Sequence, residues 1–396
     1  MSSVNPFYRR RYIPKLKLSL RRSLAIGVVL VAAGAGGYSA TRGFAATFSV
    51  AEEAESGVLA GNAAAGPDAG ASGQRVVFGG AGGTTGPLGK RISFGAFTTS
   101  NAGLGTDWMP ADIVALETRI GHKVTPVQYF SDFTSPFRLA DCKTLAAGGR
   151  DMLVSWQPNV TTASVINGSS DTYIKQFAAD TAKCPAQVSI RIYPEMNGSF
   201  AEYSPYHDRD YPGESSTHTT SVAQLVSAYR HVVTIFRTVN PGVKWVFAPN
   251  QTDDPMDANN RMEDYYPGDA YTDILAFDAY NWGDGGPFGS WQSAHDVYIE
   301  PYTRLTALNS TAPVWVTETS SKEPLVNDGY GLNPGKSKGQ WITDLFNDTA
   351  FPRLKSIVWF DINKQTNPVQ SGERDWRVNS SSDSLNALKR ALTMTP

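Results

Sequence analysis

Cysteine and histidine are scarce in this chain of 396 residues, which contains two Cys and five His. No CxxC or HExxH motif occurs, and the chain has too few Cys and His residues for a zinc site. Cys142 and Cys184 could form a disulfide in an exported protein, and we interpret both as structural. Charged residues make up 18% of the chain and apolar residues 41%. This composition fits a soluble globular protein and excludes disorder or a polytopic membrane protein.

Acidic residues are absent from residues 1–22, which contain seven Lys and Arg residues. An uncharged run from Leu24 to Ala40 follows, which is the pattern of an export signal. This run is shorter than the roughly 20 residues of a membrane-spanning helix. We therefore expect residues 1–45 to be a cleaved signal peptide or an N-terminal membrane anchor, and the protein to be extracellular or at the cell surface. The rest of the chain is acidic, which argues against a nucleic-acid partner.

Residues 46–89 are rich in Gly and Ala, and residues 47–79 predict a short strand, small-residue turns and a second strand. The stretch resembles the opening of an exported carbohydrate-binding jelly roll, in which Glu53 and Glu55 would hold calcium. It is too short to bury a core of its own. We interpret it as a linker that resembles a fragment of such a module.

Short apolar, β-branched or aromatic runs recur from residue 90 onward, and segments with helical spacing of apolar residues lie between several of them. Eight strands alternating with helices predict a (β/α)8 TIM barrel over residues 90–396. A doubly wound sheet would need a Gly-rich turn near the domain start, which this chain lacks. The predicted strands are residues 92–97, 124–130, 152–156, 188–195, 243–250, 274–280, 314–318 and 357–360, and the predicted helices include 112–120, 172–181 and 221–239.

Two of the predicted strands, the fourth and the seventh, end in a glutamate, Glu195 and Glu318. Functional residues of a TIM barrel lie at the carboxyl ends of its strands. Retaining glycosidases need two carboxyls about 5–5.5 Å apart, one protonated and one ionised. The two glutamates therefore predict a retaining glycoside hydrolase that needs no metal or organic cofactor.

The motifs around these glutamates resemble glycoside hydrolase family 26, which is known chiefly for β-mannanases and belongs to a large clan of barrel hydrolases. The resemblance covers about residues 92–391. It implies that Glu195 is the acid/base, that Glu318 is the nucleophile, that the Tyr280 hydroxyl orients the nucleophile, and that Trp359 forms an aromatic platform under the sugar. The motifs are RIYPEMNGSF, WVFAPN, YPGDAYTDILAFDAYNWG, PVWVTETSS, IVWFDINK and ERDWRVNSS.

Further residues near these strand ends are candidates for contacts with substrate. Trp156, Trp282 and Tyr203 are candidate walls of sugar subsites. Asn197 and Asn250 could donate hydrogen bonds to substrate hydroxyls or satisfy loop backbone instead.

Two charged residues, Arg191 and Glu318, bear on the charge of Glu195. Arg191 lies four residues before it, on the same face of the strand, so it would need a buried carboxylate partner, and we favour a structural role for it. Partial burial and the negative charge of Glu318 are expected to raise the pKa of Glu195.

Pro194 departs from the family pattern, which usually has a histidine directly before the acid/base. The preferred sugar therefore stays open between β-1,4-mannan, expected first, and β-1,3-1,4-glucan or β-1,3-xylan. A catalytically weak or inactive carbohydrate-binding protein is the alternative from another class, but it leaves the intact glutamate pair unexplained. We expect a monomer that cleaves a polysaccharide internally.

Overall fold

The computed structural model describes two compact units, one within residues 10–85 and a larger one that contains residues 86–396. The leader (residues 1–45) and the acidic pair Glu53 and Glu55 lie outside the described residues. Among those described, no helix is both long and apolar enough to cross a membrane. The described residues are 63–67, 74–78, 92–99, 110–207, 221–284, 290–326, 331–365 and 374–393.

The smaller unit contains an antiparallel pair of strands, β1 (Ala63–Pro67) and β2 (Gln74–Phe78), in which Ala63 is opposite Phe78. The second strand lies where the sequence predicts one. The first strand lies among small residues that were expected to form turns. These residues can form a strand because backbone pairing with β2 does not require large side chains.

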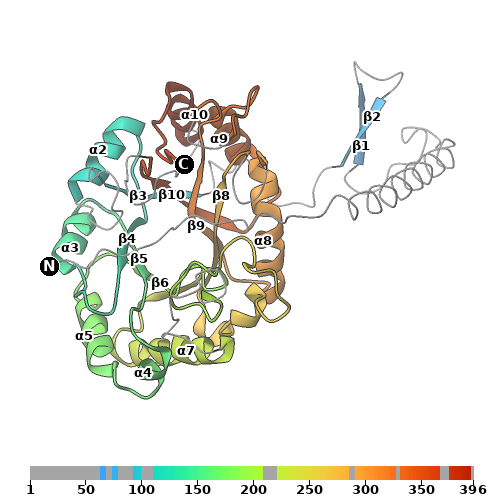
Figure 1. The fold of residues 1–396 in the computed structure, drawn as a ribbon. Coiled ribbons are helices and arrows are strands. Elements are labelled where there is room, and N and C mark those ends of the chain that lie inside the picture. The colour runs from blue at the N-terminus through green and yellow to red at the C-terminus, as the bar shows by residue number, and fades with distance from the viewer. Residues whose placement is uncertain are drawn as a thin grey trace, which may run out of the picture. The chain divides into compact units, whose positions relative to one another are not determined.

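The larger unit is a closed parallel barrel of eight strands in the order β10-β3-β4-β5-β6-β7-β8-β9 (Figure 1). This confirms the predicted (β/α)8 fold. The strands are β3 (Ser93–Thr98), β4 (Val127–Ser131), β5 (Met152–Trp156), β6 (Val188–Ile192), β7 (Lys244–Phe247), β8 (Ile274–Asn281), β9 (Val314–Ser321) and β10 (Leu354–Asp361).

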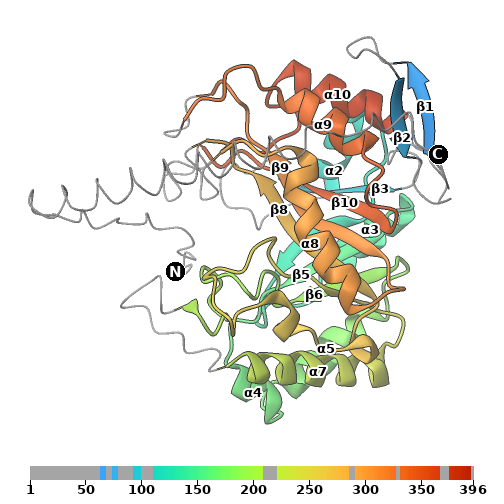
Figure 2. The ribbon, with the colours of Figure 1, turned by 90° about the vertical axis from the view of Figure 1, so that its right-hand side faces the viewer.

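Helices alternate with these strands and lie outside the barrel, as α8 does where it packs against β8 (Figure 2). The helices are α2 (Pro110–Ile120), α3 (Leu139–Ala147), α4 (Thr162–Ile166), α5 (Asp171–Thr181), α7 (Val222–Val239), α8 (Ala294–Leu308), α9 (Lys338–Asn347) and α10 (Ser382–Thr393), with short 3-10 helices η3 (Met262–Tyr265) and η4 (Asp269–Tyr271) between β7 and β8.

Helix α7 shows how the sequence specifies these elements. Ser221 caps its first turn, because the Ser221 side chain accepts a hydrogen bond from the Gln224 backbone N–H at 3.2 Å. Leu225, Val232 and Phe236 recur at helical spacing and are buried. The predicted start and end of this helix therefore agree with the structure to within one residue.

Residues in each strand alternate between the helical layer and the barrel interior. In β7, Trp245 packs against Tyr229 and Phe236 of α7, whereas its neighbour Val246 belongs to a separate buried cluster. That cluster fills the interior below the carboxyl ends of the strands and supports the polar residues above it. Its members are Leu153, Val246, Ala248, Ile274, Ala276 and Val358.

The two cysteines are joined. Cys142 of α3 and Cys184, just after α5, form a disulfide, and no free cysteine remains in the described residues. Both lie in the outer helical layer, which agrees with the structural role inferred for them.

Candidate active site

Glu195 follows β6 in an unusual backbone conformation. Tyr193 and Glu195 have φ angles of 53° and 55°, the left-handed region that residues other than glycine seldom adopt. The Glu195 N–H donates to the Ala248 carbonyl oxygen at 2.8 Å, and the Gly198 N–H donates to the Glu195 carbonyl oxygen at 2.8 Å. These bonds hold the turn that carries the glutamate. Backbone strain of this kind is concentrated at functional sites.

Glu318 lies within β9, at a bulge. Phe277 of β8 pairs with Val316, but the next residue, Asp278, pairs with Glu318, so β9 contains one extra residue. Regular alternation would place Thr317 and Glu318 on opposite faces of the strand. Because of the bulge, both side chains reach the Arg191 guanidinium inside the barrel.

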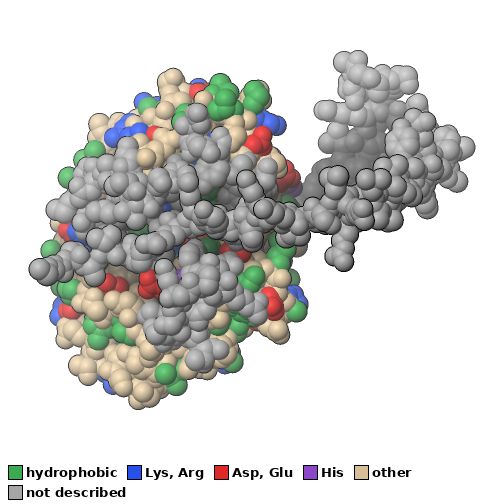
Figure 3. All heavy atoms as spheres, viewed as in Figure 1, with side chains coloured by type: hydrophobic (Ala, Val, Ile, Leu, Met, Phe, Trp, Pro, Cys, Tyr) green, Lys and Arg blue, Asp and Glu red, His purple; other side chains and the backbone are tan. Residues whose placement is uncertain are grey.

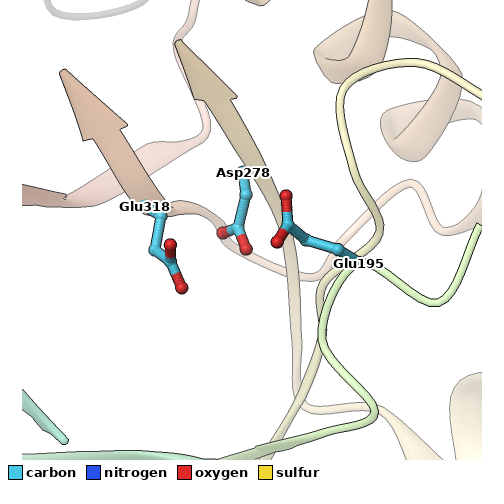
Figure 4. Close-up of side chains that lie close together, drawn as sticks. All are labelled: Glu195, Asp278 and Glu318. Atoms are coloured by element: carbon cyan, nitrogen blue, oxygen red, sulfur yellow. The ribbon is translucent and has the colours of Figure 1, made fainter. Parts of the chain in front are cut away.

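Three carboxyls meet at this end of the barrel. One carboxylate oxygen from each of Glu195, Asp278 and Glu318 lies within 4.8 Å of the other two, and Asp278 lies between the glutamates (Figure 4). They come from β8, β9 and the turn after β6. The fold therefore brings together the two glutamates that are 123 positions apart in the sequence.

Arg191 of β6 supplies the positive charge at the centre of this cluster. It is fully buried and forms ion pairs with Asp278 and Glu318. Its Nε donates to Ser155 Oγ at 2.6 Å, and its Nη1 donates to Thr317 Oγ1 at 3.3 Å. The carboxylate partners that the sequence required are thus Asp278 and Glu318, and Arg191 contacts the site itself as well as the barrel wall.

Glu195 is half-buried and does not share the Arg191 ion pairs. Removal of its carboxyl from water, together with the negative charge of Asp278, raises the pKa of Glu195 to about 8, while Arg191 and Lys364 oppose the rise. Glu195 is therefore protonated at neutral pH. The neighbouring negative charge was expected to be that of Glu318, but it is that of Asp278, the carboxyl that lies between the two glutamates (Figure 4).

Glu318 is held at both carboxylate oxygens. The Tyr280 hydroxyl donates to Oε2 at 2.9 Å, and Gln128 Nε2 donates to Oε1 at 3.2 Å. Arg191 also contacts Oε1. Hydrogen bonds from donors favour the ionised form of a carboxyl. The site therefore contains a protonated carboxyl, that of Glu195, and a second carboxyl, that of Glu318, whose donors favour its ionised form. Acid-assisted displacement at a glycosidic carbon requires this combination.

The three carboxyls are also close enough to hold a cation. The Arg191 guanidinium already lies against two of them and compensates their charge. The donor set thus fits an internal ion-pair network, and we assign no metal to it.

The chain is similar to known proteins in sequence and in fold. Residues 161–351 match the sequence model of glycosyl hydrolase family 26. A curated relative, endoglucanase H of Acetivibrio thermocellus, is 30% identical over 298 residues, which are 74% of this chain and 30% of the relative. The barrel belongs to glycoside hydrolase family 26. The chain thus spans less than a third of the length of that curated relative.

Solved structures share the fold of this family 26 domain. The catalytic domain of a family 26 endo-β-1,4-mannanase from Bacillus sp. JAMB-750 has a TM-score of 0.51 at 15% identity, over 78% of this chain and 88% of that one. An endo-β-1,4-mannanase double mutant from Cellulomonas fimi has a TM-score of 0.52 at 15% identity, over 78% of this chain and 72% of that one. At this identity the likeness concerns the fold.

The prediction that Trp359 is a sugar platform is wrong for this family 26 domain. Trp359 is buried, its ring centroid lies 6.3 Å from that of Trp341 in α9, and its Nε1 donates to the Trp376 carbonyl oxygen at 2.9 Å. It therefore faces the helical layer. Alternation turns the next residue, Phe360, to the interior, where its ring lies 6.1 Å from that of Tyr280.

Trp156 is likewise misassigned as a subsite wall. It is buried, its ring stacks 4.3 Å from that of Phe177 in α5, and its Nε1 donates to the Asp132 carbonyl oxygen. Trp282, in contrast, is only partly buried, and its ring lies 6.0 Å from that of Tyr280. Of these two tryptophans, only Trp282 is placed to contact a ligand.

Asn197, Asn250 and Tyr203 hold loops at the mouth of the barrel. Asn197 Nδ2 donates to the Thr252 carbonyl oxygen at 3.1 Å and to Asp253 Oδ1 at 3.0 Å, and its Oδ1 accepts from the Asn250 N–H at 2.7 Å. Asn250 Nδ2 also donates to Thr252. The buried Tyr203 hydroxyl donates to the Pro194 carbonyl oxygen. Satisfaction of loop backbone is therefore the role that fits both asparagines.

Three residues of the site were not predicted from the sequence, namely Asp278, Gln128 and Phe360. The sequence does indicate Asp278, because it lies two residues before Tyr280 on the same strand and therefore on the same face. Arg191 also required a buried carboxylate partner. Gln128 lay inside a predicted strand but carried no motif. Phe360 directly follows Trp359, and nothing in the sequence indicates which of these two neighbours faces the interior of the barrel.

Proposed function

We propose that this family 26 domain hydrolyses a β-linked polysaccharide internally and with retention of configuration. The observation that carries the proposal is the unequal state of two adjacent carboxyls. The pKa of Glu195 is raised to about 8, whereas Glu318 is bound by Arg191, Tyr280 and Gln128. Glu195 is the general acid/base and Glu318 is the nucleophile.

The reaction has two displacements. In the first, a carboxylate oxygen of Glu318 bonds to the anomeric carbon, the bond from that carbon to the glycosidic oxygen breaks, and the Glu195 proton passes to the departing oxygen. In the second, ionised Glu195 takes a proton from water, and the water oxygen bonds to the anomeric carbon as the ester to Glu318 breaks. Both glutamates return to their starting states.

The carboxyl spacing supports retention over inversion. An inverting enzyme keeps its carboxyls roughly 6.5–9.5 Å apart to leave room for a water molecule. Oxygens of Glu195 and Glu318 lie within 4.8 Å of each other. Such a separation suits direct attack by a carboxylate.

Two substrates have support. β-1,4-Mannan is the substrate that the sequence resemblance favours, and a β-glucan is suggested by the name of the endoglucanase relative. The relative is more than three times as long as the aligned segment, so its name does not specify the substrate of this domain. Both mannan and β-glucan are therefore tested below. Asp and Glu side chains are visible at several places on the face seen in Figure 3, which suits a neutral glycan better than a polyanion.

The direct test is hydrolysis of mannan, mixed-linkage β-glucan, β-1,3-xylan and cellulose by the full chain. Glu318→Ala should abolish turnover. Glu195→Ala should lose most activity on these glycans. On an aryl glycoside whose leaving group departs without a proton, added azide should restore turnover and give a glycosyl azide, since azide attack needs no general base. Glu300→Ala, at an exposed position of α8, is the matched control and should behave as wild type. No turnover of any glycan, or an active Glu318→Ala variant, would refute the proposal.

We further propose export, with residues 1–45 as a signal peptide or anchor and residues 46–89 as a linker. The basic stretch before the Leu24–Ala40 run supports this. Expression of the full chain in a secreting bacterial host should place activity in the medium or on the membrane. Mature protein that begins near residue 46 would indicate cleavage, and activity confined to the cytoplasm would contradict export.

A further inference from the structure

Gln128 is a neutral side chain that connects the nucleophile to the interior of the barrel. It lies on β4 and is fully buried. Its Nε2 donates to Glu318 Oε1 at 3.2 Å and to Ser155 Oγ at 2.8 Å. Ser155 Oγ also accepts from Arg191 Nε at 2.6 Å. The two groups that contact Glu318 Oε1 are therefore tied to each other through one hydroxyl.

The orientation of the Gln128 amide is set by the charge of Glu318. Its Nε2 must face the carboxylate, because the reversed amide would place Oε1 against an ionised oxygen. In this orientation Gln128 Oε1 is buried and accepts no hydrogen bond within the described residues. Buried polar atoms without partners are uncommon in folded proteins and call for an explanation. The hydrogen bond to Glu318 explains this one, because it fixes the amide in the orientation that leaves Oε1 without a partner.

The residue before the acid/base cannot replace Gln128 as a hydrogen-bond donor to Glu318. The residue directly before Glu195 is Pro194, whose side chain cannot donate a hydrogen bond. Tyr280 occupies the other oxygen of the nucleophile, Oε2. Among the described residues, Arg191 and Gln128 thus contact Glu318 Oε1.

We propose that Gln128 is a positioning residue for the nucleophile, which fixes the plane of the Glu318 carboxylate and favours its ionised form. The proposal rests on the role of Glu318 in the proposed function. Loss of the Gln128 donor disfavours the ionised form, so the acidic limb of the kcat/KM–pH profile should move to higher pH. Substrate affinity should change little, because Gln128 lies behind the nucleophile.

The test compares Gln128→Met, which keeps the length of the side chain, with Gln128→Glu in the full chain. The matched control is Gln176→Met on α5, which removes an exposed bond from Gln176 Nε2 to the Asp180 carboxylate. The primary readout is the rate at which a 2-deoxy-2-fluoro glycoside with a good leaving group labels Glu318. Wild-type labelling is measured first. Failure to label Glu318 in the wild-type protein would refute the proposed function, independently of the results for the Gln128 variants.

Gln128→Met should label Glu318 about 10- to 100-fold more slowly, the range for loss of one hydrogen bond to a charged group. The acidic limb should move to higher pH, with KM nearly unchanged. Gln128→Glu should be slower still, because the negative charge of a second carboxylate beside Glu318 disfavours the ionised form of the nucleophile. If Gln128→Met does not fold, Ser155→Ala replaces it in the test. This variant removes the second acceptor of the Gln128 amide and should give a smaller effect in the same direction. Labelling at the wild-type rate with an unmoved acidic limb in the folded variant would overturn the proposal.

Discussion

Replacement of Asp278 by Asn should make the enzyme lose activity at alkaline pH, where the wild type still works. Asp278 is the negative group beside Glu195 and the second cause, after burial, of the raised pKa of about 8. The substitution removes that charge and keeps the shape of the side chain. The pKa of Glu195 should fall, so the acid form needed for the first displacement should be lost at lower pH.

The size of this shift follows from the geometry. Two unit charges 4.8 Å apart interact by about 3.5 kcal/mol at an effective dielectric constant of ~20. That energy corresponds to about 2.5 pH units at ~1.4 kcal/mol each. The ion pair between Arg191 and Asp278 already offsets part of this field. We therefore expect the alkaline limb to move about one to two pH units toward acid.

The assay is the kcat/KM–pH profile on the best glycan of the panel, with a thermal melt to establish that Asp278→Asn is folded. Asp344→Asn, on the exposed face of α9, provides the control for loss of one negative charge elsewhere. An alkaline limb that coincides with that of the wild type in a folded Asp278→Asn variant would refute this account of the Glu195 pKa.

Three further predictions concern neighbouring features. Tyr280→Phe should lower kcat/KM about 10- to 100-fold and leave the melting temperature within a few degrees, because it removes one hydrogen bond to Glu318; unchanged kinetics would contradict this. Trp359→Phe should cost about 1–2 kcal/mol of stability in denaturant and leave KM unchanged, since the indole faces the helical layer; a large rise in KM would restore the sugar-platform interpretation. Joint replacement of Cys142 and Cys184 by Ala should cost about 4 kcal/mol in urea unfolding, from a 42-residue separation; equal midpoints with and without the disulfide would count against it.

The barrel could be predicted because parallel strands buried on both faces appear in the sequence as short apolar runs. The run at residues 152–156 matches β5 without error. The boundaries were least accurate where the chain changes direction. Glu195 was assigned to the end of a strand, but β6 ends at Ile192 and a left-handed turn carries the glutamate.

The candidate site could be predicted only in part. Glu195 and Glu318 follow from their order among the strands, and Tyr280 from the motif that it belongs to. The bulge in β9 could not be predicted, because it depends on pairing with both neighbouring strands and not on the identity of Thr317. The same limit applies to Gln128, whose role arises only when strands far apart in the sequence meet inside the barrel.

A double displacement through Glu318 retains the anomeric configuration of the substrate, so the configuration of the first product is the decisive measurement. Proton NMR during early hydrolysis of a reduced β-linked oligosaccharide resolves the new reducing end before it mutarotates. The account predicts that the β-anomer forms first and converts slowly to the equilibrium mixture. Initial release of the α-anomer would contradict it, because a single inversion would leave Glu318 no nucleophilic role.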